Sequence, residues 1–250
     1  MIDCLQKMFV LAVAVLYVQA AGKSKVIPPY IKQCIRNDPK LHECLATAIN
    51  HLRPYLKEGI NEIELPPVEP FRMDSLSLAI TGGSNGYKIT LRDIDLYGAS
   101  NFSIQKILMR PNLPFEGKIK IPKMTMDAKY ASTGVLLVLP ANGNGTFHAD
   151  LGDITATARG VLSSYQKDSE EYYNLDVLEV DLVIKKAYMV VSKVTNNRII
   201  VEATNLFLRE NGQEVLQVMM PQLRVKLAAI FKRIVNQLLT HVSADTFFSN

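Results

Sequence analysis

The feature that most restricts the possible folds is a change in the period of the hydrophobic pattern along the chain. From about residue 72 to 208, apolar residues alternate with polar ones, as they do in strands that bury one face. From about Pro221 to Val242 they recur at every third or fourth position, as in a helix. This order predicts a long antiparallel sheet followed by one long C-terminal helix.

The predicted C-terminal helix has an unusually wide apolar face. One stripe consists of Leu223, Leu227, Ile230, Ile234 and Leu238, and Phe231, Val235, Leu239 and Val242 flank it. Some 22 residues at 1.5 Å each give a rod of roughly 33 Å. Interrupting basic residues such as Arg224 and Lys232 argue against a membrane span. Because such a face exceeds what one ordinary sheet contact covers, we expect an α+β fold in which a curved antiparallel sheet wraps the helix.

Shorter features complete the expected architecture. Apolar residues at helical spacing from Leu41 to Leu56 predict a short N-terminal helix, which Pro54 should end or kink. Clusters of Gly, Asn and Asp at 82–86, 142–145 and 196–197 predict hairpin turns. The strand alternation slips by one residue between Leu91 and Ile94, which predicts a bulge or bend.

Residues 1–20 have the pattern of a signal peptide. Lys7 supplies a positive charge, residues 8–18 are apolar, and Ala20 suits the position before the cleavage site. The run is shorter than the roughly 20 apolar residues of a membrane span, although a membrane anchor remains the alternative. We therefore expect a secreted, extracellular protein whose mature chain, residues 21–250, is a single ligand-binding domain.

The cysteines and sequons fit that compartment. Of three cysteines, cleavage would remove Cys4, and the remaining Cys34 and Cys44 read as one disulfide, with two free thiols as the alternative. No second Cys or His pair stands at zinc-ligand spacing, so we expect no metal. Asn101 and Asn144 each begin an N-x-S/T sequon and are candidate glycosylation sites.

Composition and motifs argue against several functional classes. The net charge of +4 is spread evenly and the chain has no Trp, so nothing indicates nucleic-acid binding. Residues 82–86 match the G-x-S-x-G nucleophile motif, but alternating strands flank them on both sides, whereas a nucleophile elbow needs a strand feeding a helix. His42, His51, His148 and His241 form no constellation at catalytic spacing. We expect neither an enzyme nor a cofactor.

Four segments, taken in order, resemble the takeout and juvenile-hormone-binding proteins, a family of secreted insect carriers. They are residues 28–34 with the following Cys44, residues 93–98, residues 130–140 and residues 143–145. The similarity runs over essentially the whole mature chain. It implies a tubular fold with an elongated apolar tunnel, a Cys34–Cys44 disulfide and transport of lipophilic molecules such as terpenoid hormones or fatty-acid-like compounds. Where family members often carry an Asn-rich segment ending in Trp, this chain has residues 210–215, which marks it as divergent.

The predicted ligand site is apolar and is built mainly from the C-terminal helix and facing strands. Its candidate residues are Leu78, Ile89, Leu91, Tyr130, Phe147, Leu182, Leu223, Leu227, Ile230, Phe231, Ile234 and Leu238. Tyr130 is the candidate for contacting a ligand oxygen, because a buried tyrosine hydroxyl needs a partner. The partner is then a small hydrophobic ligand and the protein is expected to be a monomer. The alternatives are an ordinary filled core, a membrane-active lipid-transfer protein, or a secreted signalling protein that acts through a receptor.

Overall fold

The computed structural model describes residues 27–79, 86–109, 114–136, 139–140, 142–192 and 198–249. The predicted signal peptide and the turns at 82–85 and 196–197 therefore lie outside the described residues. In chain order the elements are β1 (Cys34–Ile35), α2 (Leu41–Glu58), the short 3-10 helix η1 (Asn61–Ile63), β2 (Phe71–Ala79), β3 (Lys88–Tyr97), β4 (Ser103–Leu108), β5 (Phe115–Thr133), β6 (Val135–Leu136), β7 (Leu139–Pro140), β8 (Gly143–Lys167), β9 (Glu170–Ser192), α3 (Arg198–Leu239), α4 (Ala244–Phe247) and β10 (Phe248–Ser249).

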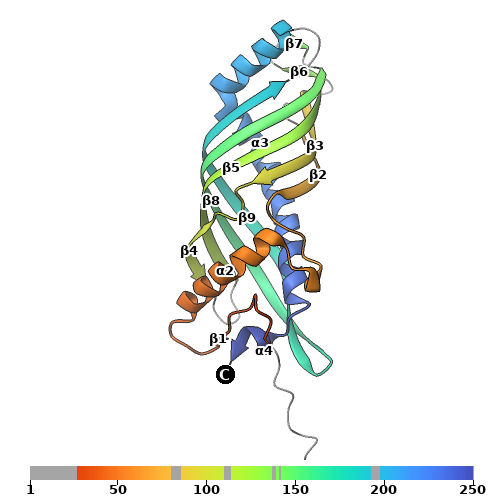
Figure 1. Ribbon diagram of the computed structural model, residues 1–250. Helices are drawn as coiled ribbons and strands as arrows, with labels where there is room; N and C mark the ends of the chain where they lie inside the picture. Colours follow the sequence, from red (N-terminus) through yellow and green to blue (C-terminus); the bar gives the residue numbers. More distant parts are fainter. Residues whose placement is uncertain are drawn as a thin grey trace, which may run out of the picture.

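The main sheet is antiparallel and curls around α3, as the hydrophobic pattern predicts (Figure 1). Its strands lie in the order β2-β3-β5-β8-β9, with β4 paired to one end of β5. The strands β8 and β9 are 25 and 23 residues long, so they reach from one end of the elongated molecule to the other. The concave face and α3 together enclose the main hydrophobic core.

The predicted slip between Leu91 and Ile94 is confirmed as a bulge. The pairing of β3 with β5 shifts register between Arg92 and Asp95. Asp93 lies between these two residues and has a φ of 49°, in the left-handed region. Such a backbone conformation is found where a bulge inserts one extra residue into a strand. Leu91 and Ile94 are each only 1% exposed, so the bulge keeps both apolar side chains inside.

The predicted boundaries of α3 and β8 were wrong. Residues 198–208 belong to α3, which begins well before Pro221 and has 42 residues. Pro221 lies inside the helix, where it lacks the N–H that would bond the preceding turn, and packing against the sheet compensates. Residues 143–145 form the start of β8 rather than a turn, because they pair with Tyr130–Ser132 of β5. The segment 210–215 likewise lies within α3.

Side chains of α3 bond the outer edge of β9, a strand that has no further strand beyond it. At one end Asn205 accepts from the Val191 N–H and donates to its carbonyl, at 2.8 and 2.9 Å. At the other end Asn236 does the same with Leu175, at 2.7 and 3.1 Å. Between them, Gln213, Arg224 and Lys232 donate to β9 carbonyls. We call these five side chains the β9 clamp; they occupy an edge that would otherwise be open to another strand.

The two ends of the described chain are joined at the α2 end of the molecule. Cys34 and Cys44 form a disulfide that attaches β1 to α2, as predicted. β1 pairs in parallel with β10, so residues near both termini share a two-stranded sheet. The helix α2 runs through Pro54 to Glu58 without ending there. A second apolar cluster, which includes Tyr30, Ile63 and Val242, packs against α2 at this end.

Candidate ligand-binding site

A cavity of about 250 Å³ lies between the concave face of the sheet and α3. We call it the apolar chamber, because every residue that lines it is hydrophobic. The strands contribute Phe71, Met73, Leu76, Leu91, Leu96, Ile119, Ile121, Met124, Met126, Phe147, Ala149, Leu151, Ile154, Ala156, Val180, Leu182, Ile184 and Met189; the helices and connections contribute Leu56, Val68, Ala99, Phe102, Leu216, Met219, Leu223, Leu227, Phe231 and Ile234. A void with no polar group stays dry and favours an apolar occupant.

The chamber brings together most of the residues that the sequence singled out. Its walls include Leu91, Phe147, Leu182, Leu223, Leu227, Phe231 and Ile234. Ile89 and Tyr130 line a smaller adjoining space. Ile230 packs against the main core, and Leu238 packs against the second cluster beneath α2. Leu78 pairs with Ile89 in the sheet, but its side chain lies outside what the structure describes.

Sequence reasoning missed what the first part of β5 and the earlier part of α3 contribute to the chamber. Ile119 and Ile121 line the chamber and alternate with polar residues along β5. The pairing of β5 with β8 is interrupted at Pro122, and beyond it Met124 and Met126 line the chamber again. A search for alternation with one slip would have found them. Five lining residues are methionines, namely Met73, Met124, Met126, Met189 and Met219. Their unbranched side chains repack easily, so the chamber wall can adapt to ligands of different shape.

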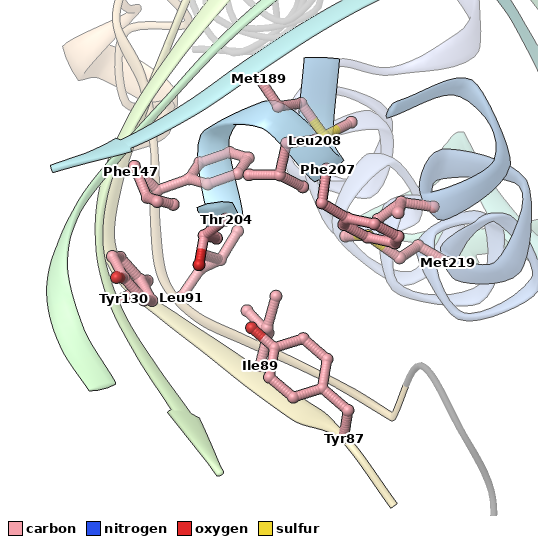
Figure 2. Close-up of a pocket in the computed structure, with 12 residues that line it drawn as sticks. Tyr87, Ile89, Leu91, Tyr130, Phe147, Met189, Thr204, Phe207, Leu208 and Met219 are labelled. Atoms are coloured by element: carbon pink, nitrogen blue, oxygen red, sulfur yellow. The ribbon is translucent and has the colours of Figure 1, made fainter. Parts of the chain in front are cut away.

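A smaller space of about 20 Å³ adjoins the chamber and shares Leu91, Phe147, Met189 and Met219 with it. We call it the tyrosine end, because Tyr87 and Tyr130 line it from the sheet side and Thr204 from α3 (Figure 2). This volume is enough for about one water-sized group. It therefore suits the polar tip of a ligand whose apolar body lies in the chamber.

The two tyrosines differ in how their hydroxyls are satisfied. Tyr87 bonds Ser132, which lowers its pKa, although burial raises that pKa more strongly. The Tyr130 hydroxyl is buried and has no hydrogen-bond partner among the described residues. Burial, reinforced by nearby Tyr87, raises the pKa of Tyr130 to about 12. Tyr130 is therefore a neutral hydrogen-bond donor at physiological pH. A buried donor without an acceptor lowers the stability of the folded protein unless a ligand or a water molecule accepts its hydrogen bond.

The described polar clusters offer no arrangement for metal or nucleophilic chemistry. No group of three or more metal-ligating side chains occurs in the part of the chain that the structure covers. His148 lies on the sheet between Asp127, at 2.7 Å, and Asp150, at 3.7 Å; the hydrogen bond to Asp127 raises its pKa. This trio is substantially exposed, and the Thr125 hydroxyl beside it donates a hydrogen bond of 3.2 Å to Asp150 rather than to His148. Four of the five residues of the G-x-S-x-G motif fall outside the described ranges.

A sheet wrapped around one long helix, with an apolar cavity between them, is an arrangement that has room for a hydrophobic molecule. The sequence profile of the family "Haemolymph juvenile hormone binding protein (JHBP)" matches residues 9–249. The chain therefore belongs to this family of binding proteins, as the sequence resemblance predicted. Among the described helices, none combines the length and hydrophobicity needed to cross a membrane.

Individual relatives agree with that assignment. The chain is 25% identical over 238 residues to the "Circadian clock-controlled protein daywake" of Drosophila melanogaster, covering 90% of this chain and 89% of that protein. The protein of the same description from Drosophila yakuba is 22% identical over 237 residues, with the same coverage. The crystal structure of Epiphyas postvittana Takeout 1 aligns with a TM-score of 0.76 at 17% identity, over 88% of this chain and 100% of that one. It establishes the shared fold.

Proposed function

We propose that this protein is a secreted carrier, without enzymatic activity, that holds one small hydrophobic ligand along the apolar chamber and the tyrosine end. The ligand is a terpenoid hormone, a fatty-acid-like compound or a related lipid with one polar tip. The observation that carries the proposal is the wall of the chamber, which encloses about 250 Å³ without a single polar side chain. An ordinary core would be filled at close packing.

The size of the chamber restricts the ligand. A cavity of about 150 Å³ holds benzene, so about 250 Å³ accommodates on the order of ten heavy atoms. Ten carbons contribute about 8 kcal/mol at 0.8 kcal/mol each. Association costs at least about 4 kcal/mol, which leaves only millimolar affinity. Micromolar binding therefore needs about fifteen carbons, which requires the methionine-rich wall to expand and the ligand to continue past Leu91 toward Tyr130.

The remaining features support a secreted protein. The Cys34–Cys44 disulfide is stable in oxidising compartments such as the extracellular space. Asn101 lies in an exposed connection before β4, where a glycan would not disturb the core. Asn144 is also the start of a sequon, although it lies in β8. Cleavage after Ala20, glycosylation at these positions and a monomeric state are parts of the same proposal.

Native mass spectrometry of the secreted protein, purified without added lipid, tests the proposal. We expect a defined extra mass that organic extraction releases as one lipophilic compound. Empty protein should bind a fluorescent fatty-acid or terpenoid probe with one-to-one stoichiometry, and the natural ligand should displace the probe. An empty protein that also takes up no probe would contradict the carrier function and favour a role in binding a receptor.

A further inference from the structure

The two flanks of α3 meet the sheet in different ways. Toward β9, the β9 clamp joins helix and strand by hydrogen bonds from Asn205 at one end to Asn236 at the other. The opposite edge of the sheet is β2. There the contact with α3 is aromatic: the rings of Phe71 and Phe231 stack with centroids 6.5 Å apart. Breaking this contact exposes apolar surface but leaves no buried polar group unpaired.

The β2 flank also holds the one exposed large side chain among the residues described as lining the chamber. Phe231 lines the chamber and yet is 40% exposed, so this one side chain separates the ligand space from solvent. Val68 in the connection before β2, Met73 in β2 and Leu227 in α3 line the chamber and are only partly buried. On the β9 flank a surface groove lies between residues 176–180 of β9 and residues 224–232 of α3, but Val180, which lines both this groove and the chamber, is only 8% exposed.

We propose that the seam between β2 and α3 is the route by which ligand enters and leaves, with Phe231 as its movable lid resting on Phe71. The inference rests on the carrier function proposed above and adds where exchange occurs. Rotation of an exposed side chain takes picoseconds to nanoseconds. Sideways separation of the seam breaks the apolar contact between Phe71 and Phe231 and, toward the α2 end, the hydrogen bond of 2.7 Å from Gln237 to the Ile63 carbonyl. Separation along β9 would break the hydrogen bonds of the clamp, which makes that flank the hinge.

The competing route is the end of the chamber beneath α2. Leu56 and Phe102 line the chamber there. Arg53 of α2 donates a hydrogen bond of 2.8 Å to the Phe102 carbonyl, and its guanidinium lies 5.9 Å from the centre of the Phe102 ring. These two contacts between Arg53 and Phe102, which we call the latch, hold α2 against the connection that leads into β4. The experiment must therefore distinguish the seam from this end.

A tether across the seam provides the main test. The double substitution Phe71→Cys/Phe231→Cys places two thiols where the rings now stack, and a short bis-maleimide then joins them. The control tethers the clamped flank by Ala187→Cys/Gly212→Cys, at a pair outside the clamp where a side chain added at Gly212 would lie 3.5 Å from the Ala187 carbonyl oxygen. Stopped-flow fluorescence with a fatty-acid probe measures association and dissociation rates before and after cross-linking. Mass spectrometry confirms each cross-link.

We expect the seam tether to lower both rates by about tenfold or more relative to the same variant before cross-linking, with the dissociation constant changed less than about threefold. A closed gate slows passage in both directions without altering the bound state. The tether on the β9 flank should change both rates less than about twofold. Equal slowing by both tethers would contradict the proposal that ligand passes through the seam between β2 and α3. Unchanged rates in a protein with a verified seam cross-link would contradict it as well.

Phe231→Ala tests the lid without any tether, and its exposed helical position makes loss of the fold a small risk. A lid predicts that association as well as dissociation becomes about threefold or more faster, whereas a residue that only lines the cavity changes dissociation alone. Arg53→Ala, which opens the latch at the other end, should leave association unchanged. Faster association in Arg53→Ala but not in Phe231→Ala would assign the route to the α2 end. If the unmodified protein bound no probe at equilibrium, the carrier function itself would fail.

Discussion

The apolar chamber and the tyrosine end share part of one wall but differ in size and chemistry. The chamber has about 250 Å³ and only hydrophobic lining residues. The tyrosine end has about 20 Å³ and contains the hydroxyls of Tyr87, Tyr130 and Thr204. Apolar contact contributes free energy in proportion to area and is tolerant of shape, whereas a hydrogen bond requires a defined donor and acceptor. The chamber should therefore set affinity and the tyrosine end should set which ligands are preferred and how they are oriented.

The largest expected effect comes from filling the chamber. Ala156→Phe adds a phenyl ring to a lining position of β8, and a benzene-sized group takes up about 150 Å³ of the 250 Å³. We expect ligand affinity to fall by about 100-fold or more, equivalent to about 2.7 kcal/mol, as measured by probe titration. Ala158→Phe, two residues along the same strand and outside the lining, is the matched control. Equal losses in both variants would indicate a general disturbance of β8.

Truncating the lining should lower affinity more modestly. Phe231→Ala removes a lining ring that is 40% exposed, so we expect binding to weaken about tenfold while the melting temperature changes little. Leu175→Ala is the contrasting variant, because Leu175 is fully buried but does not line the chamber. It should lower stability by about 2–5 kcal/mol and leave affinity near that of the unmodified protein. Unchanged affinity with a large loss of stability in Phe231→Ala would mark Phe231 as ordinary core.

The tyrosine end should alter preference rather than overall affinity. Tyr130→Phe removes a buried hydroxyl that has no partner in the described structure. We expect about a three- to tenfold loss for a ligand with a terminal oxygen, corresponding to about 0.5–1.5 kcal/mol. The affinity for the matching hydrocarbon should be unchanged or higher. Tyr188→Phe, at a 49% exposed tyrosine, is the control. Equal losses for both ligands would mean that the hydroxyl does not contact the ligand's polar tip.

The final prediction concerns stability at alkaline pH rather than ligand affinity. Burial raises the pKa of Tyr130 to about 12 in the folded protein, whereas an unfolded tyrosine titrates near 10. The stabilisation is therefore complete below pH 10 and is lost as pH rises from about 10 to 12, because the unfolded state loses its proton first. Denaturant unfolding across this range should show a shallower loss of stability in Tyr130→Phe than in the unmodified protein. Identical pH profiles would contradict the raised pKa.

The sequence predicted the architecture well because its periods are strong. Alternation located the strands, the slip at Leu91 located a real bulge, and the wide apolar face predicted a wrapped helix. It failed at Pro221, because proline is typical of a helix start. Pro221 itself is exposed, and the burial of its neighbours Met220 and Leu223 in the core, which continues the helix past it, is not visible locally. It also failed at residues 143–145, where turn-forming residues begin β8 because β5 pairs with them.

The candidate site was predictable only in part. Leu223, Leu227 and Phe231 could be identified because one helix face carries them. Whether such residues surround a void or fill one another's space depends on distances that no periodicity encodes. Ile230 illustrates the limit, since it belongs to the same stripe and yet packs into the core without lining the chamber. The identity of Tyr130 as an unpaired hydroxyl likewise needed the coordinates of its neighbours.

The β9 clamp has a consequence for how the protein is made. The helix that occupies the β9 edge leaves the ribosome after every strand of the main sheet, because α3 follows β9 in the chain. Until then the nascent sheet presents an open edge and a bare concave face, both of which favour association with other chains. Chaperones should therefore hold the chain longest at this stage, and shortening it before Arg198 should produce aggregates rather than a smaller folded protein.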